Sequence, residues 1–302
     1  MKKIILNLIL VSAAAGCLFY GCGKYANGGG KYTASIQIKG SDTIVNLIQA
    51  WSENFVQQHP TYNVSVTSGG SGAGFASLIN KTCDIAMSSR EIEDKEKSSA
   101  KKNNIKPVEF KVGLDGLAVL ANKNNPVDKL TIEQLRDIFM AKITNWKEVG
   151  GKDLKIVILS RESNSGTHMF FKKRVLRNND KNVKDEFSVH CLMMSSSQAI
   201  YDEVLQNPNA LGYVGMGFVN DGVKALSVAV DDKSRHIYPN TENVLNGSYP
   251  ISRPLYLYTN GKPSGVIKMF IDYVLSEEGQ KIVLETDFVP IKELGQKELR
   301  TL

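Results

Sequence analysis

Apolar positions along the chain alternate between two spacings, one typical of strands and one typical of helices. Ser35–Gly40 has apolar residues at every second position and predicts a strand. The residues that follow, up to Pro60, show helical spacing, which suits a helix that begins at polar capping residues and ends before proline. Tyr62–Ser68 again predicts a strand. The apolar face of this first helix is predicted to consist of Ile44, Leu47, Ile48, Trp51 and Phe55.

The same order of strand, turn and helix continues to Thr286. Further strands are predicted at Asp84–Glu91, Asp115–Pro126, Leu154–Ser160, Ala210–Val219, Lys224–Val230 and Pro254–Gly261. Further helices are predicted at Gly74–Lys81, Leu130–Lys142 and Thr167–Leu176, with two more within Ser264–Thr286. Thr131 and Gln134 form a capping box for the second of these helices. Strands that alternate with helices predict an α/β fold with a mostly parallel sheet flanked by helices.

Composition favours a folded protein and argues against a nucleic-acid partner. The 302 residues suffice for one large or two ordinary domains, and 42% hydrophobic with 23% charged residues is typical of a globular chain. The formal net charge is +6, but the lysines are scattered and form no basic stripe with interleaved aromatics.

The N-terminus has the features of an export signal. Two lysines precede an apolar run that is too short to span a membrane. Glycine precedes both Cys17 and Cys22, as in the cleavage box of a bacterial lipoprotein. Cys22 is favoured because polar, glycine-rich residues follow it; Cys17 is the alternative, and a plain secretory signal stays open. We expect a signal at 1–22, a flexible tether at 23–32, and an exported chain that is lipid-anchored on the periplasmic or outer cell-surface side.

Only Cys83 and Cys191 remain after the predicted signal, and both lie in apolar surroundings. An exported chain could join them, but two separate buried thiols are the favoured interpretation. No spacing of cysteine and histidine fits a metal site, so we expect neither a metal nor a cofactor.

Four corners after predicted strands share hydroxyl or glycine residues, and three of them open a helix. A helix N-terminus has free N–H groups and a favourable dipole for an anion, and glycine allows close approach of the backbone. In an open α/β sheet such corners gather at the carboxyl ends of the strands. The sequence therefore predicts a cradle for a small oxyanion, with Arg161 as its one formal charge. The corners are GSDT (40–43), SGGSGAG (68–74), SSRE (88–91) and RESNSGT (161–167).

Each corner alone has an ordinary explanation. Serine, threonine and aspartate are common helix caps, and Arg90 could form a surface ion pair. The segment 68–74 lacks the Lys-Ser/Thr ending of a P-loop and does not match G-x-S-x-G. His168 follows Thr167, but adjacent helical side chains diverge and no orienting acid is evident.

Taken together and in this order, the corners resemble the PstS-type phosphate-binding lipoproteins of bacterial phosphate ABC transporters. The R-x-x-x-SGT pattern at 161–167 is the most specific part, and the likeness extends from about Ser35 to about Pro290. It implies the two-lobe periplasmic-binding-protein type II fold with two hinge crossings. Lobe 1 would comprise residues 33–115 and 254–302, and lobe 2 residues 116–253.

The resemblance also implies the ligand-binding residues. One position departs, because well-known members have an aspartate where this chain has Ser89. That aspartate accepts the hydrogen of protonated phosphate and repels sulfate, so here Asp42 is the nearest candidate for the acceptor. The predicted phosphate-binding residues are Ser41, Asp42, Thr43, Ser71, Ser89, Arg161, Ser165, Gly166 and Thr167.

The function implied by the resemblance is capture of inorganic phosphate outside the cytoplasm and its delivery to an ABC permease with ATPase subunits. We expect a monomer that is not an enzyme and that meets the membrane through an N-terminal lipid. Alternatives are a receptor for sulfate, molybdate or another tetrahedral oxyanion, and an exported adhesin that retains the fold. A serine-dependent hydrolase would need a base beside Ser71 or Ser165.

Overall fold

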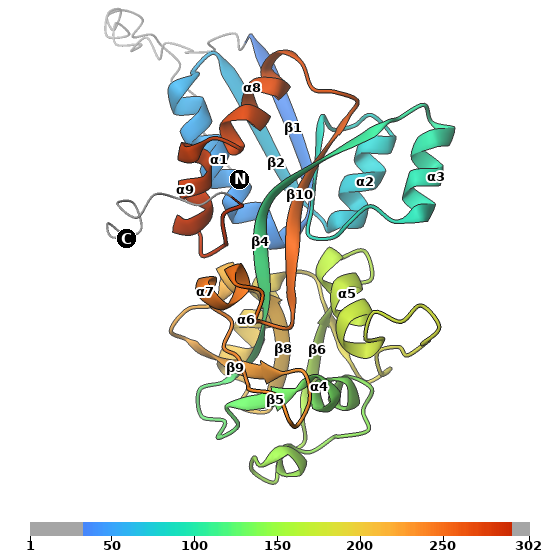
Figure 1. Ribbon diagram of the computed structural model, residues 1–302, viewed down its shortest axis with the longest axis vertical. Coiled ribbons are helices and arrows are strands. Elements are labelled where there is room, and N and C mark those ends of the chain that lie inside the picture. Colours follow the sequence, from blue (N-terminus) through green and yellow to red (C-terminus); the bar gives the residue numbers. More distant parts are fainter. Residues whose placement is uncertain (1–32, 292–302) are drawn as a thin grey trace, which may run out of the picture. The chain divides into compact units, whose positions relative to one another are not determined.

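The computed structural model describes residues 33–291, so the predicted signal and tether lie outside the described residues. Strands and helices alternate through most of this range (Figure 1). The strands are β1 (Ala34–Gly40), β2 (Tyr62–Ser68), β3 (Ile85–Ser88), β4 (Pro107–Asn122), β5 (Lys129–Thr131), β6 (Val157–Arg161), β7 (Leu192–Met194), β8 (Ala210–Gly215), β9 (Val223–Ala229) and β10 (Ser252–Asn260). The α-helices are α1 (Val45–Gln58), α2 (Ser71–Ile79), α3 (Asp94–Lys102), α4 (Ile132–Phe139), α5 (Gly166–Phe171), α6 (Ser197–Gln206), α7 (Thr241–Leu245), α8 (Gly265–Val274) and α9 (Glu277–Glu285).

Two long strands connect the two lobes of the fold (Figure 1). The main path of the sheet runs β2-β1-β3-β10-β4-β8-β6-β7. The first part of β4 pairs antiparallel with β10, and from Leu117 onward β4 pairs with β8 and β9. We define lobe 1 as β1–β3, the paired parts of β4 and β10, and helices α1, α2, α3, α8 and α9. Lobe 2 contains the rest. Parallel pairs predominate away from the crossing strands, so the predicted α/β two-lobe fold is confirmed.

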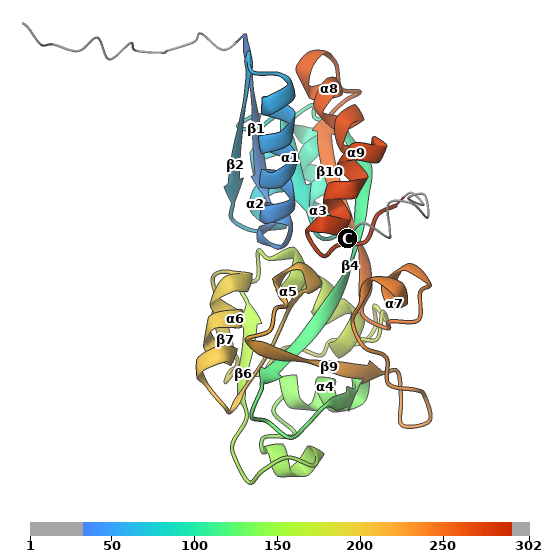
Figure 2. The ribbon, with the colours of Figure 1, turned by 90° about the vertical axis from the view of Figure 1, so that its left-hand side faces the viewer.

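Alternation along the strands of lobe 1 divides its helices between the two faces of the sheet. Ile85 and Met87 of β3 pack in a cluster with α1, α8 and α9, whereas Ala86 packs with α2 and α3. Figure 2 shows α1 beside α8 and α9. The indole N–H of Trp51 donates to the carbonyl of Gly279 at 2.7 Å, which joins α1 to α9. All five apolar residues predicted for the face of α1 are fully buried, each worth about 1.5–3 kcal/mol.

Lobe 2 follows the same rule. Leu117 and Val119 of β4 face a cluster that includes α4 and α5, whereas Ala118 and Leu120 face α6. The Tyr213 ring of β8 stacks on an aromatic side chain of α5 with 3.8 Å between ring centroids. Both faces of the sheet are thus covered, and the carboxyl ends of β1, β2, β3 and β6 are left to carry the corners.

Several elements differ from the predicted ones for identifiable reasons. Helix α2 begins at Ser71, three residues before the predicted start, so part of the second corner is already helical. Strand β4 begins at Pro107 because its first half is only partly buried and gives a weak apolar signal. Helix α3 was not predicted, since it buries Ala100 alone and depends on a capping box between Glu93 and Glu96. Helices α6 and α7 and the short strands β5 and β7 were also not predicted.

Within residues 33–291, every helix is too short or too polar to cross a bilayer. Cys83 and Cys191 are both buried free thiols in separate hydrophobic clusters, and burial raises the pKa of each to about 12.

Candidate oxyanion-binding site

The first corner is held close to β3 by its glycine. Gly40 has a φ of +142°, and a Cβ there would lie 2.1 Å from the carbonyl oxygen of Met87. The amide of Ser41 donates to that same oxygen at 2.8 Å. Asp42–Ile44 then forms a single 3-10 turn that leads into α1. Only glycine permits this approach, which brings the first corner against the strand that carries the third.

Three serines from the first three corners lie in one buried group. The Ser41 hydroxyl donates to Ser89 Oγ at 3.0 Å, and Ser71 Oγ lies 3.5 Å from Ser89 Oγ. The amide of Ser89 also donates to Ser71 Oγ at 3.1 Å. Each serine is at most 1% exposed. The structure therefore brings these predicted site residues together, although they are up to 48 residues apart in sequence.

The fourth corner meets this group from lobe 2. A Cβ on Gly166 would lie 2.2 Å from Ser71 Oγ and 2.6 Å from Ser89 Oγ, so a side chain larger than hydrogen cannot fit. Thr167 Oγ1 lies 2.6 Å from Thr43 Oγ1. Ser165 Oγ is the cap of α5, because it accepts hydrogen bonds from the two amides at 167 and 168. Its hydroxyl hydrogen remains available as a donor.

Backbone contacts also join the second and fourth corners. The amide of Gly72 donates to the carbonyl of Asn164 at 3.0 Å, and the Asn164 side chain donates to the carbonyl of Gly69 at 3.0 Å. A Cβ on Gly70 would lie 2.8 Å from the Asn164 carbonyl oxygen, and its φ is +89°. The glycines of the second corner therefore let the two lobes meet through their main chains.

Arg161 occupies the position predicted for it, but it is not the one formal charge of the site. Its Nη1 donates to Asp42 Oδ2 at 2.8 Å and to Ser197 Oγ at 2.9 Å, and its Nη2 donates to the carbonyl of Ser195 at 3.0 Å. The amide of Ser197 donates to the same Asp42 oxygen at 2.7 Å. The expectation of a single charge is wrong because Asp42 neutralises Arg161 across the lobes.

Serines 195 and 197 were not predicted as part of the site. The available signal was a run of three serines directly before helical spacing, which is typical of a helix start. That pattern is weak alone, and nothing in the sequence indicates that the start of α6 lies beside the first corner.

A second buried arginine was also missed. Arg253 Nη2 donates to Thr167 Oγ1 at 3.0 Å and lies 3.5 Å from Thr43 Oγ1. Arg253 also forms an ion pair with Asp115, with 2.8 Å between Nη2 and Oδ2. Burial raises the pKa of Asp115 and lowers that of Arg253, and the attraction between them opposes both shifts. The sequence signal for this pair was one acidic residue in β4 and one basic residue in β10, in strands that are otherwise buried.

Arg90 of the third corner has a different partner. It forms a two-pronged ion pair with Glu96, with 2.7 Å from each terminal nitrogen to a carboxylate oxygen. The side chain of Arg90 is only 9% exposed, so the expectation of a surface ion pair is corrected to a mostly buried one.

The imidazole of His168 points to Ser160 rather than to a serine of the corners. Its Nδ1 lies 3.2 Å from Ser160 Oγ, which in turn lies 2.6 Å from the hydroxyl of Tyr213. Burial is the main cause that lowers the pKa of His168 to about 4, helped by the nearby Lys172. The imidazole is therefore neutral near pH 7 and belongs to a packed network behind the corner.

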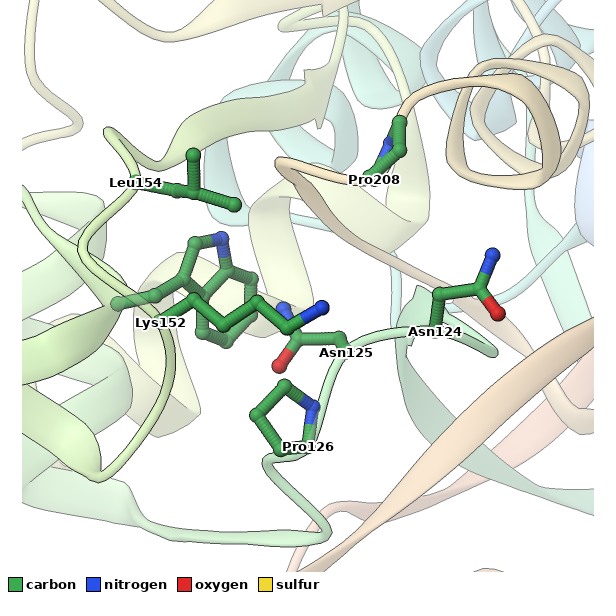
Figure 3. A pocket seen from close by; sticks show the side chains of 7 residues that line it. Asn124, Asn125, Pro126, Lys152, Leu154 and Pro208 are labelled. Atoms are coloured by element: carbon green, nitrogen blue, oxygen red, sulfur yellow. The ribbon is translucent and has the colours of Figure 1, made fainter.

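One cavity lies apart from the corners, and a larger one borders the third corner. The smaller, about 40 Å³, lies in lobe 2 between a loop after β4 and the residues before β6 (Figure 3). It is large enough for little more than a water molecule. The larger, about 460 Å³, is lined by residues that include Arg90, Arg253, Lys172, Lys173 and Arg177. Among residues 33–291 no cluster of His, Cys, Asp and Glu could hold a metal ion.

The geometry is suited to binding an anion by hydrogen bonds. Hydroxyls, helix-start amides and arginine come from four separate strand ends and converge within hydrogen-bond distance of one another. All nine predicted residues belong to this assembly, with Ser165 included through its cap of α5.

Comparison with known proteins identifies the family of the chain. Residues 26–278 match the family model of the PBP superfamily domain. The phosphate-binding protein PstS of Bacillus subtilis is 31% identical over 305 residues, which cover 97% of this chain and 96% of that protein. PstS of Staphylococcus aureus is 33% identical over 287 residues, covering 91% and 85%.

Solved structures show the same likeness. A substrate-binding protein of a phosphate ABC transporter from Clostridium perfringens, with bound phosphate, has a TM-score of 0.77 at 35% identity, covering 85% of this chain and 100% of that one. An ABC-type phosphate transport receptor from Vibrio cholerae has a TM-score of 0.66 at 32% identity, covering 84% and 99%. The family model and these relatives show that the chain belongs to the PBP superfamily and, within it, to the PstS-type phosphate-binding proteins.

Proposed function

We propose that this protein is a receptor that captures inorganic phosphate outside the cytoplasm and delivers it to the membrane permease of an ABC transporter. The proposal includes no catalytic step. Its relatives are phosphate-binding proteins by name, and the likeness extends over most of the chain.

The observation that carries the proposal is the convergence of neutral donors and arginine at the carboxyl ends of the strands. Ser41, Ser71 and Ser89 form one buried group, and Thr43 and Thr167 form another beside it. Phosphate has four oxygens that accept several hydrogen bonds each. We infer that these hydroxyls exchange their mutual hydrogen bonds for bonds to the phosphate oxygens, while Arg161 supplies a charge-assisted donor.

The lobes supply opposite sides of this site, which suggests how capture is coupled to movement. The contacts of Thr43 with Thr167 and of Asp42 with Arg161 both join lobe 1 to lobe 2. In the proposed cycle these contacts separate to admit phosphate and re-form around it. The lobe boundaries near Asp115 and Arg253 are part of this proposal, because they lie where the two connecting strands pass between the lobes.

Asp42 is proposed as the group that distinguishes phosphate from sulfate. Its Oδ2 already accepts two hydrogen bonds, while Oδ1 makes none with residues 33–291. A free carboxylate oxygen can accept the hydrogen of protonated phosphate, and it repels sulfate, which has no hydrogen to donate near neutral pH. Ser89, in the position of the aspartate of well-known members, supplies a hydroxyl instead.

The proposal also includes export, attachment by lipid at Cys22 or Cys17, and action as a monomer. These rest on the sequence features of the N-terminus, which lies outside the described residues. Labelling of growing cells with a radioactive fatty acid tests the attachment. Cys22→Ala should abolish labelling and Cys17→Ala should preserve it; the reverse result would move the attachment to Cys17, and labelling of neither parent nor variant would contradict a lipid anchor.

Calorimetric titration tests the ligand. The parent protein should bind phosphate at least a hundredfold more tightly than sulfate. Asp42→Asn should narrow that ratio at least tenfold, since the amide no longer repels a fully ionised anion. Ser98→Ala, at an exposed site on α3, serves as the control and should leave both affinities unchanged. A parent that binds sulfate as tightly as phosphate would contradict the proposed ligand, and an unchanged ratio in Asp42→Asn would contradict the role of Asp42.

A further inference from the structure

We propose that Arg253 is a second arginine of the site and donates directly to the bound oxyanion. This inference rests on the proposed function, because it concerns the same ligand. It adds a binding residue from β10, a strand that contains none of the four corners.

Arg253 lies at the passage between the lobes. It is directly opposite Asp115 in the antiparallel pairing of β10 with β4, and its side chain is 1% exposed. One residue later in β4, the strand is about to leave β10 and pair with β8. Arg253 is therefore fixed where the two connecting strands pass between the lobes, next to Thr43 of one lobe and Thr167 of the other.

The guanidinium has two edges with different uses. The edge formed by Nε and Nη2 donates to Asp115 Oδ2 at 3.0 and 2.8 Å, and Asp115 is itself held by the amide of Met216 at 3.0 Å. The other edge is formed by Nη1 and Nη2. There Nη2 donates to Thr167 Oγ1, while Nη1 is buried without a hydrogen-bond partner among residues 33–291.

A buried N–H group without a partner is rare and calls for an explanation. The Phe170 ring lies 5.4 Å from the guanidinium carbon, but this contact covers the face of the group, whereas the N–H bonds lie in its plane. The edge that carries Nη1 is the one that reaches Thr167, a predicted phosphate ligand. A planar edge of two N–H donors matches two oxygens of phosphate.

Asp115 neutralises the charge that a second arginine would add to the site. Arg161 is neutralised by Asp42 and Arg253 by Asp115, so each guanidinium is oriented by a carboxylate before the ligand arrives. Arg253 also lines the larger cavity, together with Lys172 and Lys173. The unpaired edge thus belongs to Arg253, which contacts Thr167 of the fourth corner on one side. On another side Arg253 lines the larger, cation-rich cavity.

Phosphate titration of four proteins tests the assignment: the parent, Arg253→Lys, Asp115→Asn and Arg136→Lys. Arg253→Lys retains the charge but loses the two-donor edge, so phosphate affinity should fall at least tenfold. Arg136 of α4 is the control, because it is an arginine that pairs with a carboxylate, Asp185, and lies outside the corners. Arg136→Lys should change phosphate affinity by less than threefold.

Asp115→Asn separates a ligand from a structural clamp. If Arg253 binds phosphate, removal of the Asp115 carboxylate leaves the positive charge of Arg253 free to interact with the anion. Phosphate affinity should then hold or rise, while the melting temperature falls. If Arg253 only braces the two strands, Asp115→Asn should lose affinity together with Arg253→Lys. This result, or parent-like affinity in Arg253→Lys, would overturn the inference.

Failure of the proposed function would look different. A parent protein that shows no heat with phosphate refutes phosphate capture, and the role of Arg253 falls with it. A parent that binds phosphate beside an Arg253→Lys variant that binds it equally well refutes the role of Arg253 alone. If Arg253→Lys does not fold by circular dichroism, Asp115→Asn still decides, since only the bracing role predicts that this variant loses phosphate affinity.

Discussion

The two arginine–aspartate pairs of the site differ in what holds them together. Arg161 and Asp42 come from different lobes, 119 residues apart, and the Asp42 side chain is 11% exposed. Arg253 and Asp115 face each other across neighbouring strands, at 1% and 0% exposure. The first pair exists only when the lobes meet, whereas the second is built into the strands that connect them. The first is therefore suited to report closure, and the second to remain through opening.

The largest difference between the pairs should appear in stability. Arg253→Met leaves Asp115 buried and unpaired, so the free energy of unfolding should fall by about 3–5 kcal/mol. Arg161→Ala should cost clearly less, because each aspartate keeps one backbone amide but Asp42 is closer to solvent than Asp115. Urea titration measures both. The double variant Asp115→Leu/Arg253→Met is the control and should regain most of the loss. Equal costs for the two single variants would remove the distinction.

Phosphate affinity should depend strongly on the pair of Arg161 with Asp42. Arg161→Ala should weaken phosphate binding by about 2–5 kcal/mol, or roughly 30-fold to several thousandfold, because it removes a buried charge-assisted donor. Arg161→Lys should recover only part, since a point charge cannot reproduce the planar fork. Calorimetry gives the affinities, and circular dichroism verifies folding. Parent-like binding by Arg161→Ala would show that RESNSGT is not an anion cradle.

Thr167 connects the two pairs and should have an intermediate effect. Its hydroxyl contacts Thr43 and accepts from Arg253, so Thr167→Val removes one donor and leaves two partners unsatisfied. We expect a loss of about 1–3 kcal/mol in phosphate binding. Thr82→Val, at an exposed position, is the matched control. If both variants bind equally well in calorimetry, Thr167 does not contact the ligand.

The smallest effect is expected in the pH dependence of stability, through His168, which lies near Arg161. The pKa of His168 is lowered to about 4, mainly by burial and then by the charge of Lys172, while a hydrogen bond with the Arg161 backbone and the charge of Glu186 oppose the shift. Below about pH 6.5 the unfolded chain binds a proton that the folded chain does not, so stability should fall as the pH drops towards 4. The slope from this group is at most about 1.4 kcal/mol per pH unit.

Denaturant titrations at pH 5 and 7 measure this dependence. His168→Gln removes the titrating group, so the part of the slope due to His168 should disappear in that variant. An identical slope in parent and variant would mean that other groups account for the acid sensitivity.

How much the sequence alone predicts depends on whether the signal is local. The apolar face of α1 and the capping box at Thr131 were predicted correctly because spacing and capping depend on nearby residues. The four corners could be recognised for the same reason, helped by a family pattern. Their convergence in one site follows from the general arrangement of α/β sheets.

The electrostatics of the site could not be predicted in this way. No local feature relates Asp42 to Arg161 or Asp115 to Arg253, because each pairing depends on how distant segments pack. Asp115 and Arg253 lie within apolar strands, where a single charged residue is unusual. Its burial can be explained only when the residue that pairs with it is known. Ser197 likewise serves Asp42 only because α6 begins beside the first corner.

The pairing of β4 with β10 determines which motions the protein can use. Two strands that are hydrogen-bonded side by side cannot slide past one another, because a slip of one residue would turn every side chain to the wrong face. They can still bend and twist together, and the bulge between Leu255 and Tyr256 bends the strand and increases its twist near the crossing. The lobes are thus joined by a flexible ribbon rather than by two independent tethers. In the proposed cycle this ribbon guides the rotation of the lobes, so that each closure returns the corners to the same alignment.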